Sequence, residues 1–229
     1  MKNNTLKHIS FILDGNKRWA EKNKLNETEG YKKGIDKIYE IINYCYNNKI
    51  KHVTLYLLST ENINRKNNKF FFRLAKEYFQ SFIKRIDAIG NIKINIIGEK
   101  TYVPENIIKL INKVKLEEKK DSKLILNLAF NYGFTDEIKT VISKVNTYSI
   151  ENKINIKDIK IDDFFYLNNQ PDPDILVRTG GYKRLSNFIL KNLIYTEMYF
   201  IDTLWPELSL KQIDDIILNF KRIDRNYGL

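Results

Sequence analysis

A run of apolar residues, ISFIL, stops at Asp14-Gly15-Asn16 and is followed at once by the cations Lys17 and Arg18. Asp, Gly and Asn are common turn residues, so a simple turn would explain the pattern. Cations and the exposed N–H groups of a following helix would equally suit a phosphate group. A carboxylate fits such an anion site when Mg²⁺ joins it to the phosphate. Both interpretations stay open for this loop.

A second polar loop, STENINR, follows the apolar run HVTLYLL. It offers hydroxyl, carboxylate, amide and guanidinium groups on Ser59, Thr60, Glu61, Asn62 and Arg65. The hydroxyls could hydrogen-bond a phosphate. An ordinary surface loop would have a similar composition, so this segment alone does not decide its role.

A third loop, RTGGYKRLSNF, begins at Arg178. Arg178 and Arg184 flank a Gly-Gly turn and could hold one diphosphate through forked N–H groups, with Ser186 as a further donor. The alternative is a surface hairpin with solvated cations. Further on, Glu197 lies among apolar residues, where an acid is costly to bury unless it is paired, hydrogen-bonded or metal-bound. It could supply a second carboxylate.

Strand and helix patterns alternate along the chain and must position these loops. Buried strands are predicted at residues 8–13, 52–58, 92–98, 123–133 and 174–178. Helices are predicted at about residues 28–48, 71–86, 104–114, 135–147 and 209–224. This alternation predicts one α/β domain with a mostly parallel central sheet flanked by helices. Ligands bind outside the carboxyl ends of such strands, which is where all three loops lie.

Composition limits the class of protein. A chain of 229 residues with 43% hydrophobic residues suits one domain, and its net charge of +11 suggests an anionic partner. Much of that charge is lysine in a chain rich in Lys, Asn and Ile, so it is a weak signal. The single Cys45 excludes an internal disulfide. No apolar run suits a signal peptide or a membrane span, and a soluble cytoplasmic protein is expected.

Several other chemistries lack their sequence marks. The chain has no G-x-x-x-x-G-K-[ST] or G-x-G-x-x-G motif for nucleotide binding. His8 and His52, both at predicted strand starts, have no Cys or His cluster around them and are expected to be structural. Basic and aromatic residues do not gather in a nucleic-acid docking motif, so no nucleic-acid partner is expected.

Seven segments, in order, resemble the cis-prenyltransferase family of undecaprenyl diphosphate synthases. They are HISFILDGNKRWA, LYLLSTENINR, INIIGE, LNLAFNYG, PDPDILVRTGG, RLSNFIL and YTEMYFIDTLWPE, and they extend from residue 8 to about 208. The resemblance implies a single domain over residues 1–229 with a hydrophobic tunnel, acting as a homodimer. It implies Mg²⁺-dependent condensation of isopentenyl diphosphate onto an allylic diphosphate such as farnesyl diphosphate, giving a polyprenyl diphosphate lipid carrier.

The resemblance also implies roles for individual residues. Asp14 would be the catalytic carboxylate and a Mg²⁺ ligand, Glu197 the second Mg²⁺ ligand, and Asn62 an assistant in proton removal. The allylic diphosphate would be cradled by Gly15, Asn16, Lys17 and Arg18, with Trp19 beside them. Ser59, Thr60, Glu61 and Arg65 would line the reaction site, and the isopentenyl diphosphate would be held by Arg178, Arg184, Leu185 and Ser186. One tunnel wall is expected from Phe70, Phe71, Phe72, Leu74, Tyr78 and Phe82.

The chain departs from the family pattern near the expected diphosphates. The family's usual arginine, histidine and glutamate are replaced by Glu27, Tyr31 and Tyr182, and Asn226 stands in its C-terminal Arg-x-Gly. Lys17 replaces a glycine, and Leu57 and Leu58 replace a small residue and a phenylalanine beside the tunnel. These changes lead to the hypothesis of weaker diphosphate affinity and a shorter product.

The altered C-terminus leaves an alternative open, a subunit of a heteromeric cis-prenyltransferase with weak or no activity alone. Retention of Asp14, Arg18 and Glu197 favours catalysis. Peripheral membrane contact for release of a lipid product is a further expectation from the resemblance.

Overall fold

One six-stranded sheet positions the loops described above. The computed structural model describes residues 4–63, 68–100, 103–116 and 121–224. Within them the strand order is β3-β4-β2-β1-β5-β6, and every neighbouring pair is parallel. The strands are β1 (His8–Ile12), β2 (His52–Ser59), β3 (Ile92–Ile97), β4 (Leu124–Tyr132), β5 (Ile175–Arg178) and β6 (Glu197–Phe200). The predicted α/β class is confirmed, and the sheet is entirely rather than mostly parallel.

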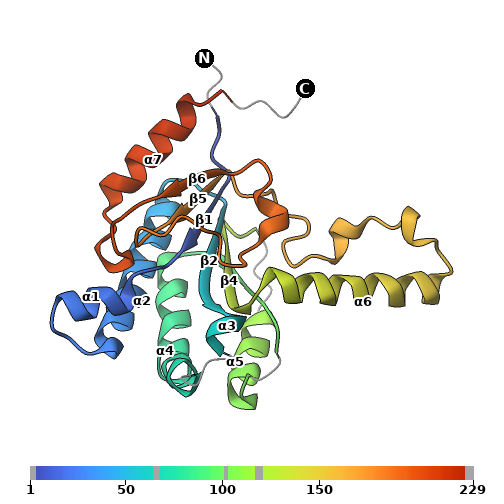
Figure 1. The fold of residues 1–229 in the computed structure, drawn as a ribbon, viewed down its shortest axis with the longest axis horizontal. Coiled ribbons are helices and arrows are strands. Elements are labelled where there is room, and N and C mark those ends of the chain that lie inside the picture. The colour runs from blue at the N-terminus through green and yellow to red at the C-terminus, as the bar shows by residue number, and fades with distance from the viewer. Residues whose placement is uncertain (1–3, 64–67, 101–102, 117–120, 225–229) are drawn as a thin grey trace.

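Helices connect the strands and cover the sheet (Figure 1). They are α1 (Asn16–Lys22), α2 (Glu27–Asn47), α3 (Thr60–Ile63), α4 (Asn68–Ile89), α5 (Glu105–Leu116), α6 (Phe134–Asn152) and α7 (Leu210–Arg222). Four short 3-10 turns lie at Ile156–Asp158, Ile161–Phe164, Leu190–Leu193 and Trp205–Glu207. The five predicted helices are present, and α6 continues five residues beyond the predicted end.

Two elements differ from the prediction. The edge strand β6 was not predicted, because its residues EMYF are half-buried or exposed and begin with a glutamate. The loop after β2 was predicted as irregular, but residues 60–63 form the helical turn α3. Its buried residues, Thr60 and Ile63, are three positions apart and therefore share one face of the turn.

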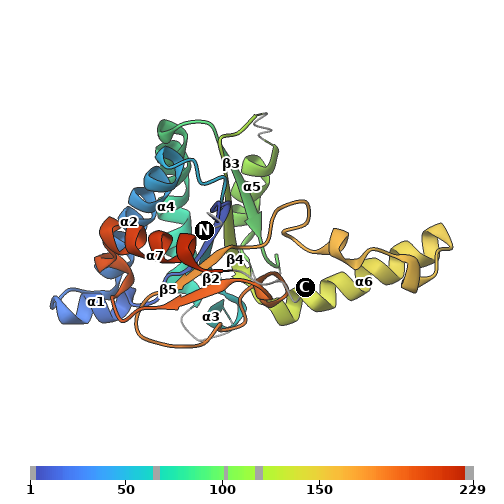
Figure 2. The ribbon, with the colours of Figure 1, turned by 90° about the horizontal axis from the view of Figure 1, so that it is seen from above.

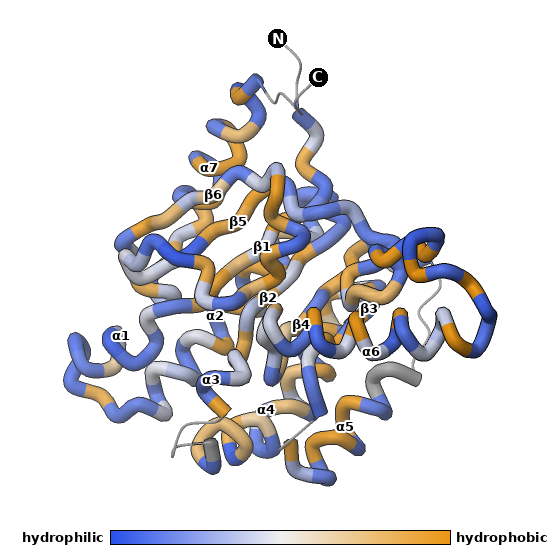
Figure 3. Tube along the Cα trace, turned by 45° about the vertical axis from the view of Figure 1, so that its right-hand side comes forward, coloured by the Kyte–Doolittle hydropathy of each residue, from blue (hydrophilic) through white to orange (hydrophobic). Residues whose placement is uncertain are grey.

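The main hydrophobic core lies between one face of the sheet and the helices α2, α4, α5 and α7. A smaller cluster covers the other face, where Tyr56 stacks on Phe188 with ring centroids 4.5 Å apart. Figure 2 shows α2, α4 and α7 gathered on one side of the sheet, while α6 projects away from it. In Figure 3, apolar residues dominate the central strands and α1 is largely hydrophilic. The sheet is thus covered on both faces, as a parallel sheet requires.

Helix starts follow local sequence signals. Asn26 caps α2 by accepting a hydrogen bond from the N–H of Glu29, and Ser209 and Gln212 form a capping box at α7. Pro104 precedes α5, where the absence of its N–H costs nothing. In the described part of the chain, no helix combines the length and apolar character needed to cross a bilayer.

Parallel register brings the three polar loops to one edge of the sheet. Ile12 of β1 lies level with Tyr56 of β2 on one side and with Arg178 of β5 on the other. The segments that follow these strands therefore leave the sheet side by side. They contain the Asp14 turn, the α3 turn and the Gly-Gly turn, which are far apart in sequence.

Candidate active site

The Asp14 carboxylate lies between two arginines. Its Oδ1 is 3.0 Å from Nη2 of Arg18, and its Oδ2 is 2.9 Å from Nη2 of Arg178. Asp14 does not cap α1, because the N-cap is Gly15 and no side chain caps that helix. A simple turn therefore does not account for Asp14, because its carboxylate forms ion pairs with both Arg18 and Arg178.

The backbone of Asp14 is held in place by its neighbours. Its N–H donates to Oγ1 of Thr179 at 3.0 Å, and the Thr179 hydroxyl donates to the Asp14 carbonyl at 2.7 Å. The N–H of Trp205 donates to the same carbonyl at 3.0 Å. Gly15 has a φ of +118°, and a Cβ there would lie 2.9 Å from Leu204. Gly15 is thus required by backbone conformation and packing, a reason that the sequence did not reveal.

Arg18 crosses the Gly-Gly turn that follows β5. Its Nη1 donates to the carbonyl of Gly180 at 2.8 Å. Gly180 has a φ of +82°, and a Cβ at this position would overlap Nη2 of Arg18. The absence of a side chain at Gly180 makes room for the guanidinium beside Asp14.

Arg178 is only 3% exposed, so it does not belong to a solvated hairpin. Its Nη1 donates to Oγ of Ser186 at 2.8 Å and to the carbonyl of Arg184, while Nη2 binds Asp14. Among the described residues, its buried Nε has no hydrogen-bond partner. An unpaired buried donor of a cation is costly, and an anionic ligand would relieve that cost.

The second loop is tied to the third. The Nδ2 of Asn187 donates to Oε1 of Glu61 at 2.8 Å, and the Tyr56 hydroxyl contacts the carbonyl of Ser186 at 3.1 Å. The N–H of Asn62, in α3, donates to Oγ of Ser59, the last residue of β2, at 3.2 Å. The loop that carries Ser59, Thr60, Glu61 and Asn62 is therefore anchored beside the arginine-bearing loop.

Three arginine side chains lie close to the aromatic ring of Tyr182. The Cζ atoms of Arg184, Arg18 and Arg178 are 4.1, 4.9 and 5.9 Å from the ring centroid. From the sequence, Tyr182 was only a replacement for a glutamate. The signal that could have revealed its role is an aromatic residue between two arginines and next to a glycine turn.

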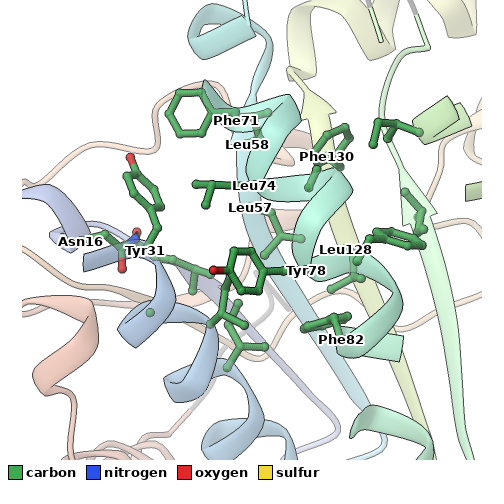
Figure 4. Close-up of a pocket in the computed structure, with 18 of the residues that line it drawn as sticks. Asn16, Tyr31, Leu57, Leu58, Phe71, Leu74, Tyr78, Phe82, Leu128 and Phe130 are labelled. Atoms are coloured by element: carbon green, nitrogen blue, oxygen red, sulfur yellow. Dashed lines mark hydrogen bonds between the residues drawn. The ribbon is translucent and has the colours of Figure 1, made fainter. Parts of the chain in front are cut away.

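An apolar cavity of about 160 Å³ opens beside the Asp14 turn. Leu13 and Asn16, on either side of Asp14 and Gly15, line the cavity, as do Ile107 and Ile111 of α5. Figure 4 shows Asn16 and Tyr31 on one side of the cavity, with Phe82, Leu128 and Phe130 on the other. Of the predicted wall, the cavity is lined by Phe71, Leu74, Tyr78 and Phe82, but not by Phe70 or Phe72.

Tyr31 stands where the cavity meets the polar site. Its ring makes edge-to-face contacts with Phe70 and Phe71, each at a centroid distance of 5.5 Å. Burial raises the pKa of Tyr31 to about 12, and the negative charges of Glu27 and Asp14 add to this shift. The phenol therefore stays protonated at neutral pH and can donate a hydrogen bond.

Some predicted site residues lie outside this cluster. Glu197 is the first residue of β6 and pairs with Ile175 of β5. Arg178 pairs with Phe200, three residues further along β6, so Glu197 lies about 10 Å along the strand from the level of Arg178. Asp14 follows the opposite, carboxyl end of β1, so one chain does not bring these two carboxylates together. Lys17 is exposed, whereas Trp19 and Leu185 are half-buried. Arg65 and Asn226 lie outside the described residues.

The carboxylate of Asp14 is a suitable ligand for Mg²⁺. Mg²⁺ prefers one or two carboxylates together with substrate phosphates and water, and Asp14 offers a carboxylate whose side chain is 26% exposed, next to Arg178 with its unpaired Nε. In the described part of the chain, no group of three or more His, Cys, Asp or Glu side chains could hold a metal without substrate. A metal here would therefore need a ligand, such as a phosphate group, to complete its coordination.

His8 and His52 are structural, as predicted. Nδ1 of His8 lies 2.7 Å from the carbonyl of Pro171, and Nε2 lies 2.7 Å from Oγ1 of Thr54. A carbonyl only accepts hydrogen bonds, so the proton of the neutral ring belongs on Nδ1. Burial lowers the pKa of His8 to about 4, and burial also lowers the pKa of His52.

The sheet places a carboxylate held by two arginines at its carboxyl edge, with an apolar cavity beside it, an arrangement that suits a ligand with an anionic head and an apolar tail. The family model described as undecaprenyl diphosphate synthase matches residues 12–228. The chain belongs to this family of cis-prenyltransferases and is a prenyl transferase.

Relatives of known name cover nearly the whole chain. An isoprenyl transferase of Aquifex aeolicus is 34% identical over 96% of this chain and 95% of its own length. A tritrans,polycis-undecaprenyl-diphosphate synthase (geranylgeranyl-diphosphate specific) of Thermoplasma volcanium is 36% identical over 97% of this chain and 88% of its own length. The crystal structure of lavandulyl diphosphate synthase from Lavandula x intermedia with dimethylallyl diphosphate superposes with a TM-score of 0.88. It is 26% identical and covers 98% of this chain and 99% of that one.

Proposed function

We propose that this chain condenses isopentenyl diphosphate onto an allylic diphosphate, such as farnesyl diphosphate, to give a polyprenyl diphosphate with new cis double bonds. The observation that carries the proposal is the position of Asp14. It lies between Arg18 and Arg178 beside the entrance of an apolar cavity. The cations suit the diphosphate groups, and the cavity suits the hydrocarbon.

In the proposed reaction the C1–O bond of the allylic diphosphate breaks, and C1 forms a bond to C4 of isopentenyl diphosphate. A proton then passes from C2 of the isopentenyl unit to an oxygen of the released diphosphate, and its C–H electron pair forms the new C2–C3 double bond. The leaving diphosphate gains negative charge as the bond breaks. Arg18 and neighbouring N–H groups, already held in place, stabilise that charge and so lower the barrier.

The two diphosphates would occupy neighbouring subsites. The allylic group would lie at Gly15, Asn16, Lys17 and Arg18, with its hydrocarbon in the cavity. The isopentenyl group would lie at Arg178, Arg184 and Ser186, where the unpaired Nε of Arg178 is available as a donor. Asn62 would assist removal of the proton, and Arg65 is proposed to line the site.

Mg²⁺ is the proposed metal, with Asp14 as its ligand from this chain. When bound, it would supply positive charge that neutralises the diphosphate oxygens. Asp14 is kept ready for it by the Thr179 and Trp205 hydrogen bonds to its backbone. The role of Glu197 as a second ligand stays a prediction, since one chain holds it far from Asp14.

A homodimer is the proposed assembly. Helix α6 projects from the sheet and exposes Ile142 and Ile150, and the segment after it exposes Ile156 and Ile161. Large exposed apolar side chains on one projecting element are typical of an interface between chains. The alternative, a partner subunit of a heteromeric enzyme, predicts weak or no turnover for the chain alone. Brief membrane contact during release of a lipid product is part of the same proposal.

The test is an elongation assay with the purified chain alone. Labelled isopentenyl diphosphate, Mg²⁺ and farnesyl or geranylgeranyl diphosphate are incubated, and the extracted lipids are sized. Elongation that needs Mg²⁺ and is lost in Asp14→Asn supports the proposal. Circular dichroism and tryptophan fluorescence serve to show that the variant is folded.

Three results would separate the alternatives. Turnover only after addition of a second protein from the same source would favour the heteromeric subunit. Full activity in EDTA would reject the role of the metal, and full activity of Asp14→Asn would reject the role of the carboxylate. Light scattering at assay concentrations would measure whether the active species is a dimer.

A further inference from the structure

The ring of Tyr182 lies within cation–π distance of three guanidinium groups. Their Cζ atoms are 4.1 Å (Arg184), 4.9 Å (Arg18) and 5.9 Å (Arg178) from its centroid, within the roughly 6 Å over which a ring attracts a cation. The three arginines come from two segments, since Arg18 is in α1 and the other two flank the Gly-Gly turn. One neutral side chain is therefore shared by cations from two parts of the site.

The acidic groups do not explain why these cations stay together. Asp14 pairs with Arg18 and Arg178, but within the described residues no carboxylate pairs with Arg184. Like charges repel, and an exposed arginine without a partner would turn toward water. A tyrosine ring attracts a guanidinium and leaves its positive charge in place, whereas a carboxylate would neutralise it. The three arginines therefore stay close together without being neutralised by the ring, and their positive charge remains available to bind an anion.

The backbone position of Tyr182 is set by the turn that precedes it. The N–H of Gly180 donates to the carbonyl of Thr203 at 2.8 Å, and that of Gly181 to the carbonyl of Ile201 at 2.9 Å. Both glycines have a φ near +80°. Tyr182 therefore follows an anchored turn, although the residue is 44% exposed.

We propose that Tyr182 is a positioning residue that holds Arg18, Arg178 and Arg184 as one cluster for binding diphosphate. The assignment of these arginines to two neighbouring subsites rests on the proposed function. Tyr182 acts through the arginines and through its ring face, so its hydroxyl is not required. This makes the role separable from any hydrogen bond of the phenol.

The test measures binding of inorganic diphosphate, without turnover, by calorimetry at low salt. Tyr182→Leu removes the ring and Tyr182→Phe keeps it. We expect Tyr182→Leu to weaken binding about tenfold and Tyr182→Phe to remain within about twofold of wild type, since the ring face carries the attraction. Tyr195→Leu, which removes another exposed ring outside the cluster, is the matched control and should bind as wild type does.

A second measurement tests directly whether the arginine side chains lie against the ring of Tyr182. In protein with labelled arginine, ring currents of Tyr182 should shift the side-chain NMR signals of Arg18 and Arg184, and the shift should vanish in Tyr182→Leu but not in Tyr182→Phe. In the elongation assay, Tyr182→Leu should raise KM for the diphosphates much more than it lowers kcat. A structural role alone would not give this split or be rescued by phenylalanine.

The inference is overturned if Tyr182→Leu binds diphosphate as tightly as wild type, or if Tyr182→Phe is as weak as Tyr182→Leu. Failure of the wild type to elongate any primer would reject the proposed function instead. The diphosphate titration and the arginine signals do not depend on turnover, so they decide the role of Tyr182 in either case.

Discussion

Arg178 binds Asp14 across two neighbouring strands, with Nη2 of the arginine 2.9 Å from Oδ2 of the aspartate. The two residues are 164 positions apart in sequence, yet Arg178 ends β5 and Asp14 follows β1, and these strands are paired in parallel register. The arginine is almost fully buried, and its other amino group is held by Ser186. A buried cation thus orients the carboxylate to which the proposed metal and diphosphate would bind.

Replacing Arg178 with lysine should impair this arrangement while preserving the charge. A single ammonium group cannot reproduce contacts to Asp14, Ser186 and the Arg184 carbonyl at once. We expect kcat/KM for isopentenyl diphosphate to fall about 100-fold, equivalent to about 2.7 kcal/mol, the range for lost charge-assisted hydrogen bonds. Steady-state kinetics measure it. Arg222→Lys, at the exposed end of α7, is the matched control, and an equal loss there would contradict the argument.

The two adjacent glycines after Thr179 should respond differently to alanine. Gly180→Ala and Gly181→Ala impose similar backbone strain, because their φ values are +82° and +80°. Only the Cβ at Gly180 would overlap Arg18, whereas the one at Gly181 meets Oδ1 of Asp202 at 3.1 Å. Gly180→Ala should therefore raise KM for the allylic diphosphate about tenfold more than Gly181→Ala does, for loss of one charge-assisted contact.

Both variants should lose similar stability in urea, of about 1–3 kcal/mol for a residue in the left-handed region. The urea midpoints give this comparison. Equal KM values for the two variants would show that the space beside Gly180 is not what positions Arg18.

Leu57 should limit the length of the product. It is a half-buried residue of β2 that lines the cavity, and shortening it to alanine enlarges the space available to the hydrocarbon. We expect Leu57→Ala to shift the products toward longer chains by one or more isoprene units. The loss of stability should be below about 3 kcal/mol, because the side chain is only partly buried. Mass spectrometry of the extracted lipids measures the shift.

Leu126→Ala is the control for that experiment. It removes a fully buried leucine from the same core cluster, but Leu126 does not line the cavity. It should lower the melting temperature without lengthening the product. If both variants gave the same products, cavity shape at Leu57 would not govern chain length.

His8 should make the fold sensitive to acid. Its pKa is lowered from 6.5 to about 4 by burial, so between these values the unfolded chain binds more protons than the folded chain. The contribution of His8 to the free energy of unfolding is therefore fully present above pH 6.5 and is lost as the pH falls toward 4. The loss is on the order of 3 kcal/mol. Urea unfolding at pH 7 and at pH 4.5 measures it.

His8→Gln removes the titrating group and should flatten the pH dependence of the unfolding free energy. The neighbouring groups that act on His8 are His52 and Asp174, and both remain in this variant. An unchanged slope in His8→Gln would assign the acid sensitivity to another group.

The periodicity of the sequence was enough to predict most of the scaffold. Largely apolar runs mark β1, β2, β4 and β5, because these strands are covered on both faces. In the edge strand β3, IKINII, isoleucines alternate with Lys93 and Asn95 before the strand ends. The strand β6 escaped prediction because an edge strand with a half-buried glutamate has no such run. For the same reason the sequence could not place Glu197, whose distance from Asp14 depends on the register of that unpredicted strand.

Side-chain chemistry in the loops indicated the anion site, but not how it is held together. Asp14, Arg18 and Arg178 were predicted and do meet in the structure. Thr179 was missed because its value lies in a buried contact with a backbone 165 residues away. Tyr182 was missed as a participant because a ring shared by three arginines has no local sequence pattern.

The central place of β1 has a consequence for a chain that is still being synthesised. When the ribosome has made residues up to β4, the nascent polypeptide already contains Asp14, Asn62 and most of the walls of the cavity. It lacks β5, so one side of β1 is an unpaired edge open to aggregation, and Arg178 and Tyr182 do not yet exist. Unfinished or prematurely terminated copies would thus carry hydrophobic surface without catalytic power, which makes them natural targets for chaperones and proteases.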